Sequence, residues 1–208
     1  MRSMYTYIEQ APAIARDIIA HREALVGPLV EQFCGMAPKR LLIVASGSSY
    51  DIAMSMRPFM QQTLGIEVSV EWPMSYILYN HAQNDETFVL CMSQSGRSTN
   101  TIEAVRRAQA CGHHVAVLTC NPDAPMREYC EHVYAYGSGT EDYYVAKGFP
   151  TSCIYLALFA IEAARALDVR GADDCAALLS DVSAVVEDMD GVYRAARSFA
   201  EKHLDAFV

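Results

Sequence analysis

The chain begins with apolar residues at helical spacing and then changes its period. Between about Tyr5 and Phe33, isoleucine, leucine and valine recur every three or four positions, which predicts a short and a longer helix separated at Pro12. After Pro38 the pattern becomes a short apolar run without alternation, at 41–45. A strand that is covered on both faces lacks polar alternation, so this run predicts a central parallel strand.

Four further runs predict the other strands of the same sheet. The run at 67–70 is weaker and typical of an edge strand. The remaining runs lie at 87–91, 114–119 and 132–136. Helical patterns fill the intervals at 50–64 and 101–110, and a glycine follows each of them where a C-terminal cap belongs. This alternation predicts an α/β fold with a doubly wound, five-stranded parallel sheet flanked by helices.

Two long helical patterns complete the chain. The segment 149–167 is strongly apolar and too long for a strand, and a second pattern runs from 173 to about 201. Residues 192–208 resemble the approach to the first strand, so they either begin a second copy of the unit or simply end a terminal helix. The predicted organisation is N-terminal helices at 1–36, one α/β domain at 37–170, and a long helix in the segment 171–208, for whose end both alternatives remain open.

Composition and net charge exclude several classes of protein function. The 208 residues are 52% hydrophobic and 20% charged, which is enough apolar side chain for one large core and excludes wholesale disorder. The net charge of -9 argues against a nucleic-acid backbone or an anionic membrane surface as partner. Any phosphate must therefore be held by local geometry, and we expect neither a nucleic acid nor a membrane among the partners.

Cysteine usage and the N-terminal segment point to one compartment. The seven cysteines are an odd number, scattered, and without a C-x-x-C pair, which is typical of reduced thiols and of neither a disulfide framework nor a zinc site. The first thirty residues contain no apolar signal segment, and no run approaches the roughly 20 apolar residues of a membrane span. We expect a cytoplasmic protein with no metal and no cofactor.

Two serine-rich loops follow predicted strands, at 45–50 and 93–99. Ligands of open α/β sheets bind at the carboxyl ends of the strands, and the helix that follows each loop presents free N–H groups and a partial positive charge to an oxyanion. Their candidate binding residues are Ser48, Ser49, Ser93, Gln94, Ser95 and Ser98. Serine is also an ordinary helix cap, so capping remains an alternative to ligand binding here. Neither a Walker motif nor G-x-G-x-x-G occurs.

A third loop carries charged residues after the last predicted strand. Glu141 in this loop is a candidate base or partner of a hydroxyl, and Lys147 follows it. Taken as isolated residues, both are better explained as solvated surface charges. The pair His113 and His114 has no metal-type spacing and fits the start of a strand.

Taken together, these motifs resemble one known family. The stretches 46–49, 93–98 and 139–141, the last followed by 145–149, are similar in order and spacing to the signatures of the sugar isomerase (SIS) domain, whose S-Q-S-G-x-[ST] motif is close to diagnostic. The resemblance is greatest to the isomerase half of glucosamine-6-phosphate synthases and to related phosphosugar isomerases and deglycases. It implies a flavodoxin-like SIS domain at 37–170 and, at 171–208, a linker helix leading into a second SIS domain.

The resemblance also implies residue roles. Ser93, Gln94, Ser95 and Ser98 would cradle a sugar phosphate, and Ser48 and Ser49 would meet sugar hydroxyls. The carbonyl of Val145 would contact the sugar, as would Lys147. Here the chain departs from the family pattern, because one residue fewer separates Glu141 from Lys147 and no hydroxyl residue stands at 146 or 147.

The function that the resemblance implies is binding of a phosphorylated ketose or amino sugar by the N-terminal half of a double-SIS, homodimeric enzyme. Such an enzyme would isomerise the sugar, act as an aminotransferase of this type, or cleave a C–N bond. In the family the acid-base glutamate, the ring-opening histidine and the Schiff-base lysine lie in the second domain or the tail, so Glu141 is the single catalytic candidate here. The alternative is a regulatory module that senses a sugar phosphate without turnover.

Overall fold

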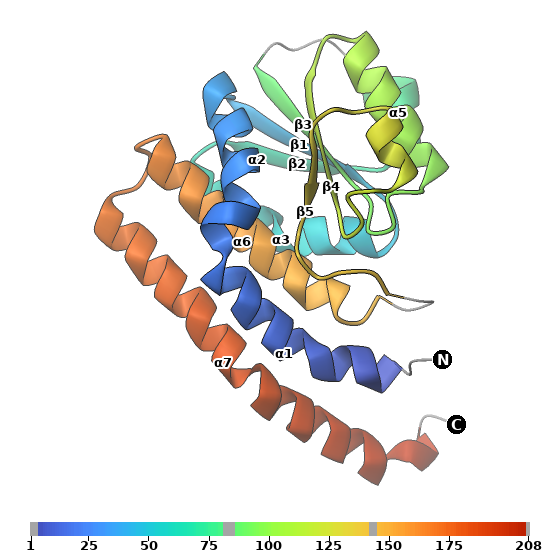
Figure 1. Ribbon diagram of the computed structural model, residues 1–208, viewed down its shortest axis with the longest axis vertical. Helices are drawn as coiled ribbons and strands as arrows, with labels where there is room; N and C mark the ends of the chain where they lie inside the picture. Colours follow the sequence, from blue (N-terminus) through green and yellow to red (C-terminus); the bar gives the residue numbers. More distant parts are fainter. Residues whose placement is uncertain (1–3, 81–85, 142–144, 207–208) are drawn as a thin grey trace.

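The computed structural model describes residues 4–80, 86–141 and 145–206, and its centre is one parallel sheet (Figure 1). The strands are β1 (Arg40–Ala45), β2 (Glu67–Glu71), β3 (Thr87–Met92), β4 (His114–Thr119) and β5 (Val133–Ala135). They pair in parallel in the order β2-β1-β3-β4-β5, which is the flavodoxin-like order. All five predicted strands are confirmed, including the edge position of β2.

The described residues form six helices of twelve residues or more. They are α1 (Met4–Ala20), α2 (Arg22–Met36), α3 (Ser48–Leu64), α5 (Thr99–Ala110), α6 (Gly148–Ala166) and α7 (Ala172–Lys202). Short helical segments complete the described chain: α4 (Pro73–Ser75), the π-helix η1 (Tyr76–Asn80), and the 3-10 turns η2 (Pro125–Glu128) and η3 (Leu204–Ala206).

The predicted helix boundary at Pro12 is wrong. Helix α1 continues through Pro12, and the break between α1 and α2 falls at His21. A proline inside a helix removes one hydrogen bond and costs about 3 kcal/mol. Here Ala11, Pro12 and Ala15 are all buried, and α1 packs against α6 and α7. Tertiary packing of this face outweighs the local preference of proline.

Alternate residues of the central strands enter two separate cores. Leu41 and Ile43 of β1 belong to the larger core, under α2, α3 and α6, whereas Leu42 and Val44 belong to the smaller core, beneath α5. In the larger core the ring of Phe33 makes edge contacts at 5.2 Å with two other phenylalanine rings, those of Phe88 and Phe159. Both faces of the sheet are thus covered, which is why the strands read as continuous apolar runs.

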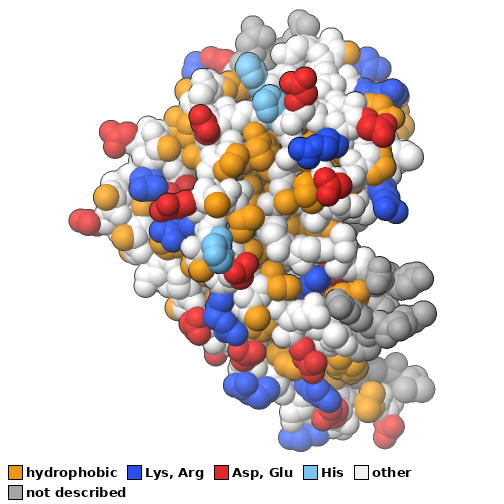
Figure 2. Space-filling view, viewed as in Figure 1, with side chains coloured by type: hydrophobic (Ala, Val, Ile, Leu, Met, Phe, Trp, Pro, Cys, Tyr) orange, Lys and Arg blue, Asp and Glu red, His pale blue; other side chains and the backbone are white. Residues whose placement is uncertain are grey.

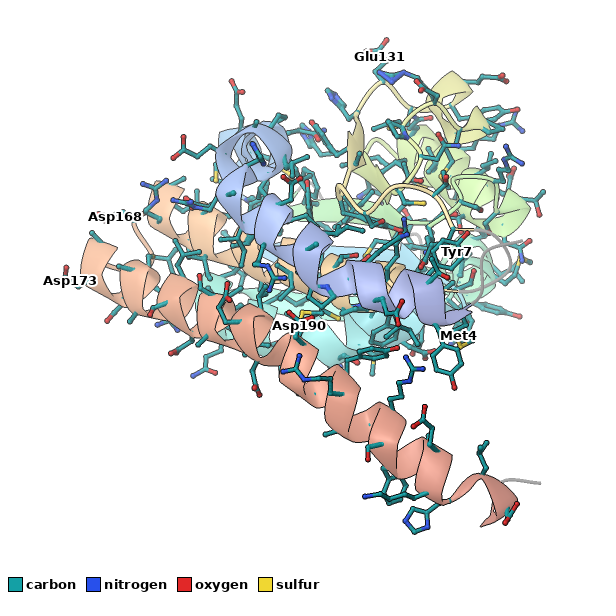
Figure 3. The ribbon with its side chains drawn as sticks, turned by 60° about the horizontal axis from the view of Figure 1, so that its bottom comes forward. Met4, Tyr7, Glu131, Asp168, Asp173 and Asp190 are labelled. Carbon is teal, nitrogen blue, oxygen red and sulfur yellow. The ribbon has the colours of Figure 1, made fainter. Side chains whose placement is uncertain are left out.

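Helix α7 lies alongside α1 and then extends past the rest of the domain (Figure 3). Arg16 of α1 reaches Asp190 of α7 at 3.4 Å. Beyond this contact, Val192 and Phe199 of α7 are exposed. The assignment of 171–208 to a linker helix and the start of a second domain stays a prediction.

The surface mixes both charge signs. On the face seen in Figure 2, acidic and basic side chains are interspersed. Within the described ranges, no helix combines the length and the apolar character needed to cross a bilayer.

Candidate functional site

The site lies where the strand order reverses. Successive strands are added on opposite sides of β1, with β2 on one side and β3 on the other, so the loops after β1 and β3 diverge at their carboxyl ends. A cavity of about 580 Å³ opens there. Its lining includes eight of the predicted site residues, namely Ser48, Ser49, Ser93, Gln94, Ser95, Ser98, Glu141 and Val145. Three loops distant in sequence are therefore brought together, and the prediction of one shared site fits this geometry.

The loop after β3 depends on a glycine for its shape. Gly96 has φ +64°, which favours glycine, and an ideal Cβ on it would lie only 2.4 Å from the Cβ of Ala124. Its carbonyl accepts the N–H of Met126, and its own N–H donates to the carbonyl of Ser93 at 3.1 Å. The loop is thus a tight turn pressed against the segment that follows β4.

The carbonyl of Gln94 fixes the direction of the next peptide. It accepts the N–H of Cys120 at 3.0 Å and the hydroxyl of Thr119 at 3.0 Å. In a planar trans peptide the N–H points opposite to the C=O, so the N–H of Ser95 faces away from β4. Among the residues the structure describes, the N–H groups of Gln94, Ser95 and Ser98 have no hydrogen-bond acceptor. The turn before α5 is therefore a nest of free donors.

Ser95 and Ser98 also stabilise the turn itself. The Oγ of Ser95 accepts the N–H of Arg97 at 3.3 Å. Ser98 is the N-cap of α5, and its Oγ accepts the N–H of Thr101 at 3.4 Å. Because a hydroxyl that accepts one bond still has its own proton to donate, capping and ligand binding are compatible roles for these serines. Ser93 is 6% exposed, and its hydroxyl has no hydrogen-bond partner among the described residues.

The loop after β1 supplies the opposite wall. Gly47 is the N-cap residue of α3, and Ser48 and Ser49 form the first turn of that helix. Ser49 is buried and Ser48 is partly buried, and both line the cavity. Ser48 and Ser49 thus lie at a second helix N-terminus, on the same cavity as the nest before α5.

Glu141 is held by four donors. Its Oε1 accepts the N–H groups of Ala146 at 3.1 Å and Lys147 at 2.6 Å. Its Oε2 accepts the N–H of Gly148 at 3.1 Å and the side-chain amide of Gln94 at 2.7 Å. The carboxylate therefore lies at the N-terminus of α6, and it is not the solvated surface charge that the sequence left open.

Lys147 stands apart from the other predicted site residues. It is 6% exposed, it is absent from the cavity lining, and its ammonium lies 5.4 Å from the centre of the Tyr7 ring. Tyr7 is on the side of α1 that faces the domain (Figure 3). Of the described carboxylates, none lies within ion-pair distance of Lys147. The structure thus turns this side chain toward α1, whereas Val145 lines the cavity as expected.

Sequence reasoning missed the contribution of the segment after β4. Cys120 and Asn121 line the cavity. Burial, together with the charge of Glu141, raises the pKa of the Cys120 thiol to about 11, so it remains protonated at neutral pH and donates to the carbonyl of Gln94 at 2.7 Å. The rule that ligands bind at the carboxyl ends of strands also applies to β4 and would have found both residues. In the part of the chain that is described, no group of histidine, cysteine, aspartate or glutamate is arranged to hold a metal.

The fold is a flavodoxin-like α/β domain, and its cavity lies at the switch point of the sheet, where ligands of such folds bind. Comparison with known proteins names the family, because the sequence profile of the SIS domain matches residues 37–166. The chain belongs to the SIS domain family.

Individual relatives agree with this assignment. The glutamine–fructose-6-phosphate aminotransferase of Methanothermobacter thermautotrophicus is 27% identical over 138 residues, which are 66% of this chain and 23% of that protein. A proposed phosphosugar isomerase of Clostridium difficile 630 shares the fold with a TM-score of 0.90 at 21% identity, over 99% of this chain and 58% of that chain.

A third similarity is to the C-terminal domain of the glucosamine–fructose-6-phosphate aminotransferase of Francisella tularensis. The TM-score is 0.81 at 18% identity, over 95% of this chain and 57% of that chain. At such low identities the two solved structures show a shared fold. The chain spans about a quarter of the length of the curated relative and somewhat more than half of each solved chain.

Proposed function

We propose that the chain binds the phosphate ester of a phosphorylated ketose or amino sugar in this cavity. The observation that carries the proposal is the nest before α5, where the N–H groups of Gln94, Ser95 and Ser98 lack acceptors within the described chain and belong to residues that line the cavity together with several other serines. A helix N-terminus with free donors stabilises a phosphate without any lysine. The sugar would then extend toward Ser48, Ser49 and Val145.

We further propose that this domain is the N-terminal half of a double-SIS phosphosugar isomerase, aminotransferase-like enzyme or deglycase. The support is the greater length of the relatives that share its fold. Such a reaction opens the sugar ring, moves a proton between C1 and C2 and stabilises an enediolate. In that scheme this domain contributes positioning through a phosphate that is remote from the reacting carbons. A cytoplasmic homodimer belongs to the same proposal.

One observation favours the second candidate function, which is sensing of a sugar phosphate without turnover. Among the described lining residues Glu141 is the single carboxylate, and its oxygens already accept four hydrogen bonds. No histidine or lysine lines the cavity within the described chain. A general base would therefore have to come from outside this set of residues.

Ligand-induced stabilisation tests the binding site. We expect fructose 6-phosphate or glucosamine 6-phosphate at 100 times Kd to stabilise the wild-type chain by about 2.7 kcal/mol, and Ser93→Ala to abolish this shift. Ser183→Ala is the matched control, because Ser183 lies on α7 and bonds only to the carbonyl of Leu179 among described residues. Unphosphorylated fructose should have no effect. An unchanged shift in Ser93→Ala would contradict the phosphate cradle.

A variant of Ser98 separates its capping role from ligand binding. Aspartate is as good an N-cap as serine, but its charge repels a phosphate. We expect Ser98→Asp to keep the thermal stability of the free protein and to lose stabilisation by either sugar phosphate. Retained ligand stabilisation in this variant would mean that Ser98 is a cap only.

Isotope exchange distinguishes the catalytic function from the sensing function. The chain is incubated with fructose 6-phosphate in D₂O, and deuterium at C1 is followed by NMR. Incorporation would show that this chain carries a base for the enediolate chemistry. Binding without incorporation would show that the chain alone only binds, as expected from the occupied carboxylate of Glu141.

A further inference from the structure

The four hydrogen bonds of Glu141 argue against its role as a base. An ionised carboxylate has about four lone-pair positions, and these are filled by three backbone N–H groups and by the amide of Gln94. To accept a substrate proton, Glu141 would have to give up one of these donors. Through these hydrogen bonds Glu141 instead connects two parts of the site that are far apart in the sequence.

The first of these parts is the N-terminus of α6. Helix α6 begins at Gly148 with Lys147 as its N-cap residue, and the N–H groups at such a helix start have no intrahelical acceptor; Ala146 immediately precedes them. Glu141 accepts all three, and its negative charge also complements the helix dipole. This helix end is consequently occupied by an internal anion.

The second part is the side chain of Gln94, in the loop before α5. A carboxylate only accepts, so the amide nitrogen of Gln94 must face Glu141 and the amide oxygen must face elsewhere. That oxygen is buried and has no hydrogen-bond partner in the described chain. The hydrogen bond to Glu141 thus sets the orientation of the Gln94 amide, because the amide oxygen gains no hydrogen bond in this orientation.

Close packing reinforces the contact. An ideal Cβ on Gly148 would lie 2.2 Å from the amide nitrogen of Gln94 and 2.9 Å from Oε2 of Glu141. Real Cβ atoms do not approach other atoms so closely, so the first residue of α6 has to be glycine for Gln94 and Glu141 to meet. Gln94, Glu141 and Gly148 are therefore in mutual contact.

We propose that Glu141 is a positioning residue, which links the N-terminus of α6 to Gln94 and thereby holds the turn 93–98 in the shape that binds the phosphate ester. This inference rests on the proposed function. It assigns Glu141 an effect on the phosphate end of the ligand, although the residue lies in a different loop from the phosphate nest.

Two probes distinguish positioning from direct contact with the sugar. Dissociation constants for fructose 6-phosphate and for inorganic phosphate are measured by calorimetry in the wild type and in Glu141→Gln. The glutamine brings a second amide N–H₂ against the donors, so the link to Gln94 is lost at nearly constant volume. We expect both constants to rise at least tenfold and by a similar factor, because both ligands use the same turn.

The matched control is Glu162→Gln. Glu162 lies on α6 and pairs with Arg22 and Arg165, so the substitution removes the same charge from the same helix without touching the turn. Both dissociation constants should stay within twofold of the wild type. If Glu141→Gln does not fold, Gly148→Ala decides the question, because its Cβ displaces Gln94 while the carboxylate remains; the same parallel loss of both ligands is expected.

The possible outcomes separate this inference from the proposed function. If the wild type binds no sugar phosphate, the proposed function is wrong. If the wild type binds and Glu141→Gln binds both ligands equally well, the positioning role is overturned. Loss of fructose 6-phosphate affinity with unchanged phosphate affinity would also overturn it, since Glu141 would then contact the sugar itself.

Discussion

Replacement of Gly96 by alanine tests how closely the turn before α5 must approach the segment after β4. The φ of +64° costs an alanine about 1–2 kcal/mol. The new Cβ would lie 2.4 Å from the Cβ of Ala124 and 3.1 Å from the hydroxyl oxygen of Thr119, so the backbone must move. Overpacking of this kind costs about 1–3 kcal/mol. We therefore expect a total loss of about 2–5 kcal/mol, a large fraction of a typical domain stability.

Gly112 provides the matched control for backbone strain. It has φ +78°, and no atom lies within 4 Å of its ideal Cβ. Gly112→Ala should therefore lose only the strain term of about 1–2 kcal/mol. Urea unfolding measures both variants, and the difference between them reports the contact with Ala124. Equal losses in the two variants would refute the argument that close approach makes Gly96 necessary.

A double-mutant cycle identifies the contact itself. Ala124→Gly removes the methyl group nearest to the new Cβ, so Gly96→Ala should be less destabilising in the Ala124→Gly background. Ligand affinity should follow the same order, because the turn that contains Gly96 also contains the free N–H groups. If the losses of stability in the two single variants simply add in the double variant, the strain lies elsewhere in the turn.

The remaining predictions concern buried groups. Burial raises the pKa of Cys120 to about 11, so the folded state keeps a proton that the unfolded chain releases near pH 8.5. The stability that this thiol contributes is therefore lost as the pH rises from about 8.5 to 11. Melting curves between pH 8 and 10.5 should fall less steeply in Cys120→Ala than in the wild type, and identical slopes would contradict the assignment. Phe33→Ala, which empties the space between Phe88 and Phe159, should cost about 3–5 kcal/mol in urea unfolding, whereas Phe199→Ala on the exposed part of α7 should stay within about 0.5 kcal/mol. A small loss in Phe33→Ala would mean that this part of the core is not closely packed.

Local patterns predicted the strands because each central strand is buried on both faces. The run 41–45 reads as continuous apolar sequence since Leu41 and Leu42 enter different cores. Pro12 shows the opposite case, in which packing against α6 and α7 overrides a local signal. A single proline therefore predicts a helix boundary less well than the whole face that the helix buries.

The sequence predicted only the part of the site whose residues directly follow the ends of strands. Serines after two adjacent parallel strands must converge at one edge of the sheet, and they do. The four bonds of Glu141 and the turn of Lys147 toward Tyr7 depend on contacts between distant segments. No local pattern of apolar and polar residues contains that information.

The electrostatics of the three helix N-termini at this edge assign an orientation to the proposed ligand. The first turn of α3 contains the carboxylate of Asp51, and the start of α6 is occupied by Glu141. The first turn of α5 contains no acidic residue. A phosphate dianion is repelled by a nearby carboxylate and stabilised by an unneutralised helix N-terminus, so it belongs at α5. In the proposed complex we therefore expect the uncharged hydroxyls of the sugar to face Ser48 and Ser49 of α3, where a neighbouring negative charge does not disfavour them.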